Sequence, residues 1–276
     1  QTLPPLVQRL FKHLPLAQLA VRGAVFGIFE TLNGGMQNIA AMKQFQRLAL
    51  FNLRRTVRDP EIRQRLTPNY VIGCKRVLQS NQWYPALVQK NVDVISSALA
   101  EVRGKTLIAA DGSEHEVDVI ILGTGFEVAE PPIAKRVFNR YGVSMADVWQ
   151  GSPEGYLGTM VADCPNGFLM FGPNIAVSSS AFLIIEAQLT YIVDAITQAR
   201  AQDITSIETN PERMAEFNRR VQSALQDSVW NRGGCSSYFI DRNGRNSTAW
   251  PWTTLEMRRQ LSRFNLNEYL INQQSA

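Results

Sequence analysis

The front of the chain carries an apolar periodicity typical of helices. Over residues 5–57, leucine, valine and phenylalanine recur three or four positions apart, with Arg and Lys between them. The pattern predicts two helices interrupted at Gly34-Gly35, the second running from about Asn38 to Val57. Asp59-Pro60-Glu61 predicts a further short helix ending near Thr67-Pro68, because it offers an N-cap carboxylate, a proline at the first position and an acid near the positive end of the helix dipole.

Residues 92–122 change character and predict a small antiparallel meander that leads into a core strand. Alternating segments at 98–102 and 106–110 read as strands, and Asp111-Gly112 is a strong hairpin signal. The run 119–122 is apolar at every position, as in a strand buried on both faces of an α/β sheet.

The remainder alternates between helical and extended patterns. Ser144 and Asp147 resemble a capping box that opens a helix toward Trp149. The uncharged stretch 164–185 is long enough for a membrane span, but its prolines, glycines and serines favour a buried strand, a loop and a buried helix. The strands and helices predicted in this part are 156–161, 168–171, 182–199 and 210–230.

The length of 276 residues, 45% of them apolar and 19% charged, predicts one large or two moderate globular domains. The composition excludes collagen-like chains and disulfide frameworks, and a net charge of +4 argues against disorder. Two complete dinucleotide-binding domains would not fit comfortably in this length. Because the chain also begins at Gln1 rather than Met, we expect a fragment of a longer protein.

The three cysteines, Cys74, Cys164 and Cys235, are widely spaced and form no CxxC motif. An odd number at this spacing favours structural cysteines in a reducing, cytoplasmic compartment over a secreted scaffold. The only histidines, His13 and His115, argue against a histidine-based metal site, and we expect no metal.

Positive charge gathers at the front of the chain. Residues 1–90 hold thirteen Lys and Arg against three Asp and Glu, whereas the rest holds fifteen against twenty-one. A basic front favours an anionic partner, such as nucleic acid, an acidic lipid or a cofactor phosphate. The alternative is a solvated helical face that meets an acidic surface, and charge alone leaves both open.

Two glycine-containing segments carry candidate chemistry. Gly73-Cys74-Lys75-Arg76 places adjacent cations after a glycine, and on an extended backbone they point opposite ways. Arg76 suits a phosphate or an oxyanion that needs a fixed charge, and the alternative is an ordinary salt-bridging pair. Gly123-Thr124-Gly125-Phe126 follows the predicted core strand without the third glycine of GxGxxG, so it is either a ligand contact or a tight turn.

Two further segments have equally open interpretations. Gly172-Pro173-Asn174, followed by Ser178–Ser180, fits an anion or cofactor contact as well as a capped helix start. The aromatic and polar stretch Gly233–Tyr238 fits the wall of a substrate cavity as well as a C-terminal wrap.

Taken in order, several blocks resemble the C-terminal part of Baeyer–Villiger monooxygenases, which belong with the flavin-containing monooxygenases. The resemblance runs over nearly the whole chain, and the residues before Tyr70 look like the helical insertion that many of these enzymes carry in the NADP domain. The blocks are Gly73–Arg76 with Trp83–Pro85, Asp118–Phe126, Gly155–Val161, and Pro165-Asn166 with Phe171–Asn174.

The resemblance implies an α/β fold built from the C-terminal parts of two dinucleotide-binding domains, with a helical insertion and a small antiparallel meander. Residues 1–122 would complete an NADP-binding domain, with the insertion at 1–70 and the meander at 92–122. Residues 123–276 would complete an FAD-binding domain. Both glycine motifs of the family and its histidine signature precede this segment and are absent here. We therefore expect the N-terminal half of the same protein as a partner.

The resemblance also implies an FAD- and NADPH-dependent enzyme that inserts one oxygen atom of O₂ into a ketone, through a peroxyflavin, to give an ester or lactone. Arg76 matches the family's catalytic arginine, and Lys75 would lie near the NADP. Thr124-Gly125-Phe126 matches the crossing toward the FAD domain, and Gly172-Pro173-Asn174 matches the turn near the flavin. Tyr238 joins them as a predicted cofactor-binding residue.

The sequence departs from the family's pattern at two positions, and two other functions stay open as alternatives. Gly123 stands where the family usually has Ala, and Ser237 stands where many relatives have a Trp near the NADP, which leaves that contact open. Oxygenation of an amine or sulfide is the alternative within the class. A non-catalytic module whose basic helices meet nucleic acid or a membrane is the alternative outside it, but the front lacks the interleaved aromatic residues of a nucleic-acid module.

Overall fold

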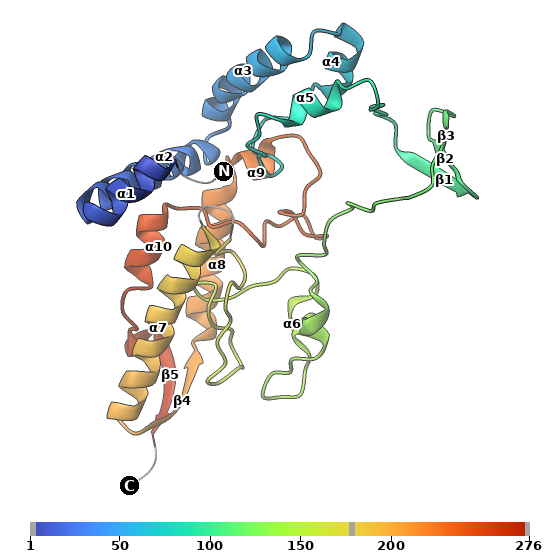
Figure 1. The fold of residues 1–276 in the computed structure, drawn as a ribbon. Helices are drawn as coiled ribbons and strands as arrows, with labels where there is room; N and C mark the ends of the chain where they lie inside the picture. Colours follow the sequence, from blue (N-terminus) through green and yellow to red (C-terminus); the bar gives the residue numbers. More distant parts are fainter. Residues whose placement is uncertain (1–3, 177–179, 274–276) are drawn as a thin grey trace.

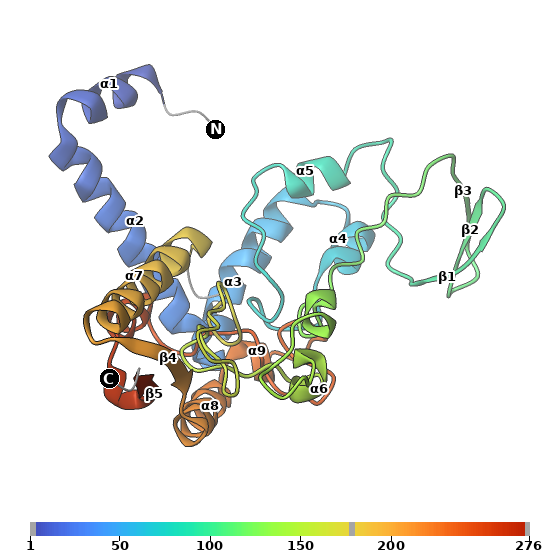
Figure 2. The same cartoon turned by 90° about the horizontal axis from the view of Figure 1, so that it is seen from below.

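The computed structural model describes residues 4–176 and 180–273. These residues form a helical arm, a C-terminal body and a small outlying sheet (Figure 1). The arm lies across one end of the body, and the sheet projects beside them on extended segments, as the view in Figure 2 also shows. The candidate site lies where the arm meets the body.

The arm contains the predicted helices with three differences: the first is divided between His13 and Pro15, a short helix at Trp83–Leu87 was not predicted, and one boundary is corrected. The interruption predicted at Gly34-Gly35 is wrong, because the helix continues through both glycines and the turn comes at Gln37. Glycine weakens a helix interior by about 1 kcal/mol, and here Asn33 and Met36 hold the last turn against the body. The helices are α1 (Pro5–His13), α2 (Pro15–Met36), α3 (Ile39–Thr56), α4 (Pro60–Leu66) and α5 (Trp83–Leu87).

Side-chain caps begin α3 and α4 where the sequence predicts them. The side chain of Asn38 accepts hydrogen bonds from the amides of Ala40 and Ala41. The carboxylate of Asp59 accepts from the amides of Glu61 and Ile62 in the same way. Each cap contributes about 1 kcal/mol. These starts are confirmed because they depend on interactions within a single turn.

The predicted meander is confirmed as an antiparallel sheet of order β1-β2-β3. Its strands are β1 (Leu99–Arg103), β2 (Thr106–Ala109) and β3 (Glu114–Glu116), and the turn at Asp111-Gly112 joins the last two. Gly112 has a positive φ of 83°, which glycine adopts without strain.

The core strand predicted after the meander does not form. Residues 117–122 carry no strand assignment, and Val119 and Ile121 are 75% and 91% exposed. A strand that is apolar on both faces is stable only between neighbouring strands and under covering helices. The described residues supply neither beside this segment, so its apolar side chains face outward.

The body is built around a long helix and a two-stranded sheet. The predicted helix at 182–199 is confirmed as α7 (Ala181–Ala201), whereas the strands predicted at 156–161 and 168–171 are irregular loops. The antiparallel pair of β4 and β5 was not predicted. The elements of the body are α6 (Met145–Trp149), α7, β4 (Ile204–Thr209), α8 (Pro211–Leu225), α9 (Val229–Arg232), α10 (Thr254–Gln260) and β5 (Tyr269–Gln273).

Two helix boundaries in the body follow from capping. Ser144 accepts a hydrogen bond from the amide of Asp147, which confirms the capping box at the start of α6. The helix predicted to reach Trp230 is divided, because Ser228 caps α9 through the amide of Asn231 and α8 has ended at Leu225.

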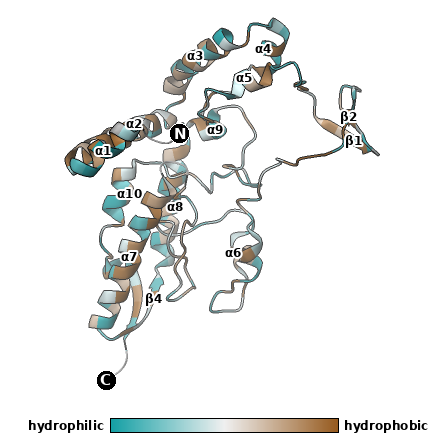
Figure 3. Ribbon diagram, in the orientation of Figure 1, coloured by the Kyte–Doolittle hydropathy of each residue, from teal (hydrophilic) through white to brown (hydrophobic). Residues whose placement is uncertain are grey.

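Aromatic side chains fill the core of the body. Trp230, Trp250 and Phe264 are fully buried, and hydrophobic residues mark α7 and β4 in Figure 3. Met42 of the arm and Cys74 belong to the same cluster, so the arm is attached to the body by shared packing.

No helix in the described part of the chain has the length and apolar character that crossing a bilayer requires.

A buried glutamine holds the irregular loops of the body onto α7. Gln188 is fully buried, and its Oε1 accepts a 2.8 Å hydrogen bond from the amide of Phe171. Its Nε2 donates to Gly158 O at 2.8 Å, and lies 3.1 Å from Thr159 Oγ1 and 3.2 Å from Leu169 O. One side chain thus replaces the strand pairing that the sequence pattern suggested for these segments.

We expect Gln188→Leu to lower the free energy of unfolding by about 2–4 kcal/mol, because it leaves several buried polar groups without partners. Urea denaturation measures the loss. Gln202→Leu, at an exposed position just after the same helix, is the matched control and should change stability by less than about 0.5 kcal/mol. Equal losses in both variants would contradict this role of Gln188.

Candidate functional site

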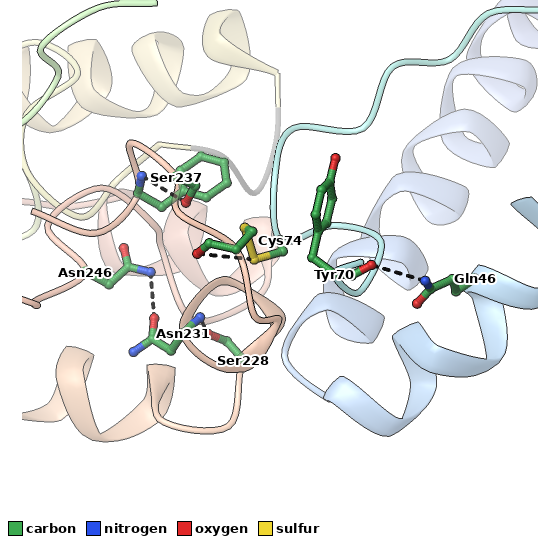
Figure 4. The surroundings of a disulfide bond; sticks show 9 residues. Gln46, Tyr70, Cys74, Ser228, Asn231, Ser237 and Asn246 are labelled. Atoms are coloured by element: carbon green, nitrogen blue, oxygen red, sulfur yellow. Dashed lines mark hydrogen bonds between the residues drawn. A yellow bond between two sulfur atoms is a disulfide. The ribbon is translucent and has the colours of Figure 1, made fainter. Parts of the chain in front are cut away.

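The segment around Tyr70–Val77 is held between the arm and the body. Gln46 of α3 donates a 3.1 Å hydrogen bond from Nε2 to Tyr70 O, and the amide of Val71 donates to Gly233 O at 2.9 Å. Figure 4 shows the first of these contacts on the arm side and Cys74 on the body side. The segment is therefore fixed from two directions before it reaches Lys75 and Arg76.

Close packing explains the glycine that precedes the two cations. Gly73 has a positive φ of 93°, and a Cβ there would lie 3.0 Å from Met42 Cε and 3.1 Å from Val229 Cγ1. A side chain would therefore be strained as well as crowded. Gly73 is the point at which α3, α9 and the cationic segment touch.

Cys74 and Cys235 form a disulfide, which corrects the expectation that the cysteines are unpaired. They are 161 positions apart, and neither their spacing nor their neighbours indicates the pairing. Cys164 is free, and burial raises the pKa of its thiol. The disulfide joins the cationic segment to the start of the Gly233–Tyr238 stretch.

A cavity of about 710 Å³ opens between α2 and this segment. The α2 wall is largely apolar, with Phe26, Phe29 and Met36 among its residues, and Trp230 and Phe239 belong to the body side. None of the residues Gly233–Tyr238 lines this cavity, whereas Phe239, which follows that stretch, does.

The charged groups of the cavity are all positive. Arg22, Lys75, Arg76 and Arg258 line it, and no Asp or Glu is among the lining residues. Within residues 4–176 and 180–273, none of these four cations forms an ion pair with a carboxylate. The structure therefore disfavours the ordinary salt-bridging pair, and the cavity attracts anions.

Lys75 and Arg76 both line two cavities. Besides the large one, they line a cavity of about 280 Å³ that is also bounded by Tyr84 and Trp83. Lys75 Nζ lies 5.1 Å from the centre of the Tyr70 ring, a cation–π contact that holds the ammonium near the segment. Arg76 has no comparable contact in the described structure and is exposed.

The predicted crossing at residues 124–126 and the predicted turn at 172–174 do not line the cavity of Arg76. Thr124, Gly125 and Phe126 lie in an exposed irregular segment, with Phe126 90% exposed. Val128 and Ala129, just beyond them, line a cavity of about 350 Å³ together with Gly172 and Pro173. The residues just beyond the crossing and those of the turn therefore line one cavity. Arg76 lines a different one.

Asn174 and Tyr238 do not line the large cavity that holds the four cations. Asn174 is buried, and its Nδ2 donates to Asn246 O at 2.7 Å and to Ala249 O at 3.2 Å, which gives it a structural role. Tyr238 is exposed and packs edge-on against Phe239, 4.5 Å between ring centres. Ser178 and Ser179 lie outside the described residues, and Ser180, which directly precedes α7, lines the large cavity.

Three residues of the large cavity were missed by sequence reasoning. Arg22 and Arg258 look like surface cations of amphipathic helices. Asn33 is buried and donates from Nδ2 to Trp252 O at 3.1 Å, while its Oδ1 has no partner in the described structure. An asparagine inside an apolar helical run is the one signal that could have identified it.

Comparison with known proteins shows that the resemblance extends along the chain. A Baeyer–Villiger monooxygenase of Streptomyces coelicolor is 41% identical over 265 residues, which cover 95% of this chain and 51% of that protein. The chain spans about half the length of the relatives it matches. No protein-family model matches the sequence.

Solved structures show the same fold. Cyclohexanone monooxygenase from Rhodococcus sp. Phi1, bound to NADP⁺, superposes with a TM-score of 0.73 at 24% identity, covering 86% of this chain and 46% of that one. OTEMO in complex with FAD and NADP superposes with a TM-score of 0.76 at 20% identity, covering 85% of this chain and 45% of that one.

Within the described residues, no group of three or more His, Cys, Asp or Glu is placed to hold a metal ion.

We expect Gly233→Ala to destabilise the chain by about 1–3 kcal/mol, as in an overpacked core. A Cβ there would overlap Val229 O and lie 2.6 Å from Cys74 Cβ. Gly123→Ala is the matched control, since a Cβ at that glycine meets nothing within 4 Å. Thermal unfolding compares the two, and a variant at 233 as stable as the one at 123 would show that the contact with Cys74 is not close.

Proposed function

Because the chain is homologous to the C-terminal portion of Baeyer–Villiger monooxygenases, we propose that it supplies part of the active site of an FAD- and NADPH-dependent monooxygenase. The proposed reaction inserts one oxygen atom of O₂ into a ketone and gives an ester or lactone. The observation that carries the proposal is the cavity in which Lys75 and Arg76 face no carboxylate. FAD, when bound, supplies the activated oxygen, and NADPH supplies the hydride.

The cavity suits an anionic cofactor on chemical grounds. Four cations around a partly apolar space attract phosphate groups, and the apolar α2 wall accepts an aromatic ring or an apolar substrate. A guanidinium keeps its charge at any working pH, so Arg76 can stabilise negative charge that develops on oxygen. Lys75, held beside Tyr70, would bind the NADP side of the same space.

The crossing and the turn would serve the flavin. The cavity lined by Gly172, Pro173 and the residues just beyond the crossing has glycine and proline at its rim, so backbone can approach a ligand closely there. We assign Thr124, Gly125, Phe126 and Asn174 to this FAD side, by their match to the family, and keep Tyr238 as a proposed cofactor-binding residue. The domain division proposed is 1–122 for NADP and 123–276 for FAD.

The exposed segment 117–126 supports the proposal that another portion of the protein, which carries the glycine motifs, packs against this chain. Val119, Ile121, Leu122 and Phe126 each have at least three quarters of their surface exposed, although the sequence is that of a buried strand. Single exposed apolar residues are common, but a continuous exposed run marks an interaction surface. We propose that the nucleotide-binding portion covers this run with neighbouring strands.

We expect Arg76→Ala to lower the rate of ester formation by about 100- to 1000-fold, which is the usual cost of removing one oxyanion-stabilising group. The assay uses the flavin-loaded monooxygenase that contains this chain, with NADPH and a ketone. Arg54→Ala, in an exposed basic cluster of α3, is the control and should leave the rate within twofold. Ester formation that survives Arg76→Ala would remove the catalytic assignment, and oxidation of a sulfide without ester formation would favour the heteroatom oxygenases.

We expect Ile121→Asp to leave the melting temperature of this chain alone unchanged, because the side chain is 91% exposed. In the monooxygenase that also contains the nucleotide-binding portion, the same change should cost about 3–5 kcal/mol, since it would bury an unpaired charge. Leu255→Asp on α10, where the leucine is 66% exposed, is the control for both measurements. Equal stability of both variants in the assembled protein would show that nothing covers the segment.

A further inference from the structure

We propose that the disulfide between Cys74 and Cys235 positions Arg76 in the cavity, and that a dithiol reductant releases it. The inference rests on the proposed function, because it concerns how that arginine is held. Cys74 stands two positions before Arg76 in the sequence, and Cys235 lies between Trp230 and Phe239, which line the same cavity. The bond therefore connects two walls of the site.

The disulfide is the last firm attachment of the segment before Arg76. Main-chain hydrogen bonds hold Val71 to Gly233 and close a turn from Cys74 to Val71. Beyond Cys74, the described structure records no main-chain hydrogen bond for residues 75–79, which have no helix or strand assignment. Regular structure returns at α5, where Ser80 Oγ accepts from the amides of Gln82 and Trp83.

Among the side chains that follow Cys74, Val77 is half-buried, and its neighbours on either side are exposed. Arg76 is exposed, and Leu78 is 68% exposed. The cation–π contact to Tyr70 belongs to Lys75, one position closer to the disulfide. Because Arg76 has no ion pair in the described residues, its position depends on the backbone, and the backbone depends on the bond at Cys74.

The surroundings of the disulfide permit exchange with a small thiol. Cys74 is fully buried, whereas Cys235 is half-buried and is followed by the exposed Ser236. Gly233 and Gly234, which precede Cys235, have no side chains to cover it. A thiolate of the reductant attacks Cys235 Sγ, the bond between the cysteines breaks, and the second thiol of the reductant then displaces Cys235.

The exchange balances as a two-electron transfer. The dithiol loses two electrons and two protons and becomes an internal disulfide. Cys74 and Cys235 gain them and become thiols. The reverse reaction needs an oxidised disulfide of the same class. After reduction, the Val71–Gly233 hydrogen bond and the burial of Cys74 remain, so the fold persists while the stretch from Lys75 to Gln79 loses its covalent attachment.

The first test uses this chain and needs no activity. Backbone order parameters from ¹⁵N relaxation should fall at residues 75–79, from about 0.8 to below about 0.6, when the disulfide is reduced with dithiothreitol, while α7 around Gln188 stays rigid. Cys235→Ser should show the low order parameters with or without dithiothreitol. Cys164→Ser, which removes the free thiol, should respond as the unchanged chain does. Unchanged order parameters at 75–79 after reduction would overturn the proposal.

The second test asks whether the effect acts through Arg76. In the flavin-loaded monooxygenase, reduction should lower kcat for ester formation by about tenfold, leave KM for the ketone within twofold, and raise the NADPH consumed per ester formed. Reoxidation should restore the rate. In an Arg76→Ala background, reduction should change the remaining rate by less than twofold, whereas a merely structural disulfide would lower it again.

The outcomes separate this proposal from the proposed function. An oxidised enzyme that makes no ester from any ketone contradicts the proposed function, while the order parameters at 75–79 still judge the positioning. An enzyme that makes ester equally well with and without the disulfide overturns the positioning and leaves the proposed function standing. A reduced protein that unfolds at assay temperature assigns the disulfide to stability alone and also overturns the proposal.

Discussion

The packing around Cys74 is the constraint on which the rest of this structure depends. At this point a buried half-cystine, Gly73, Gly233 and Met42 meet, and there is no room for a further side chain. The contact joins a helical arm to a body that comes more than a hundred residues later in the chain. It also sets where the next two residues, both cations, enter the cavity against α2. This contact therefore contributes to the attachment of the arm and sets the location of the charge.

Local features of the sequence were sufficient to predict most of the helices. Asn38, Asp59, Ser144 and Asn210 each cap the helix that follows them, because capping depends only on residues within one turn. Strand prediction failed where pairing needs partners that the described chain does not place alongside, as at Val119–Leu122. The pair β4 and β5 was missed for the opposite reason, since its partners lie about sixty residues apart and give no local signal.

The candidate site was predicted in part. The cationic pair could be found because two charges after a glycine, outside the helices, are unusual, and the resemblance gave Arg76 a role. Arg22, Asn33 and Arg258 could not be found, since they enter the cavity only through the tertiary arrangement of α2 and α10. The disulfide was unpredictable on similar grounds, because a spacing of 161 residues says nothing about proximity. The sequence could not reveal which distant segments line the same cavity.

Arg76 lies at the junction of arm and body and lines a cavity whose charged groups are all positive. The most direct measurement is a crystal structure of the flavin-loaded monooxygenase with NADP⁺ and an oxidised Cys74–Cys235 pair. We expect the guanidinium of Arg76 to lie in the cavity against α2, in contact with the nucleotide or the flavin and unpaired with any carboxylate. Arg76 paired with an acidic side chain outside that cavity, and distant from both cofactors, would contradict it.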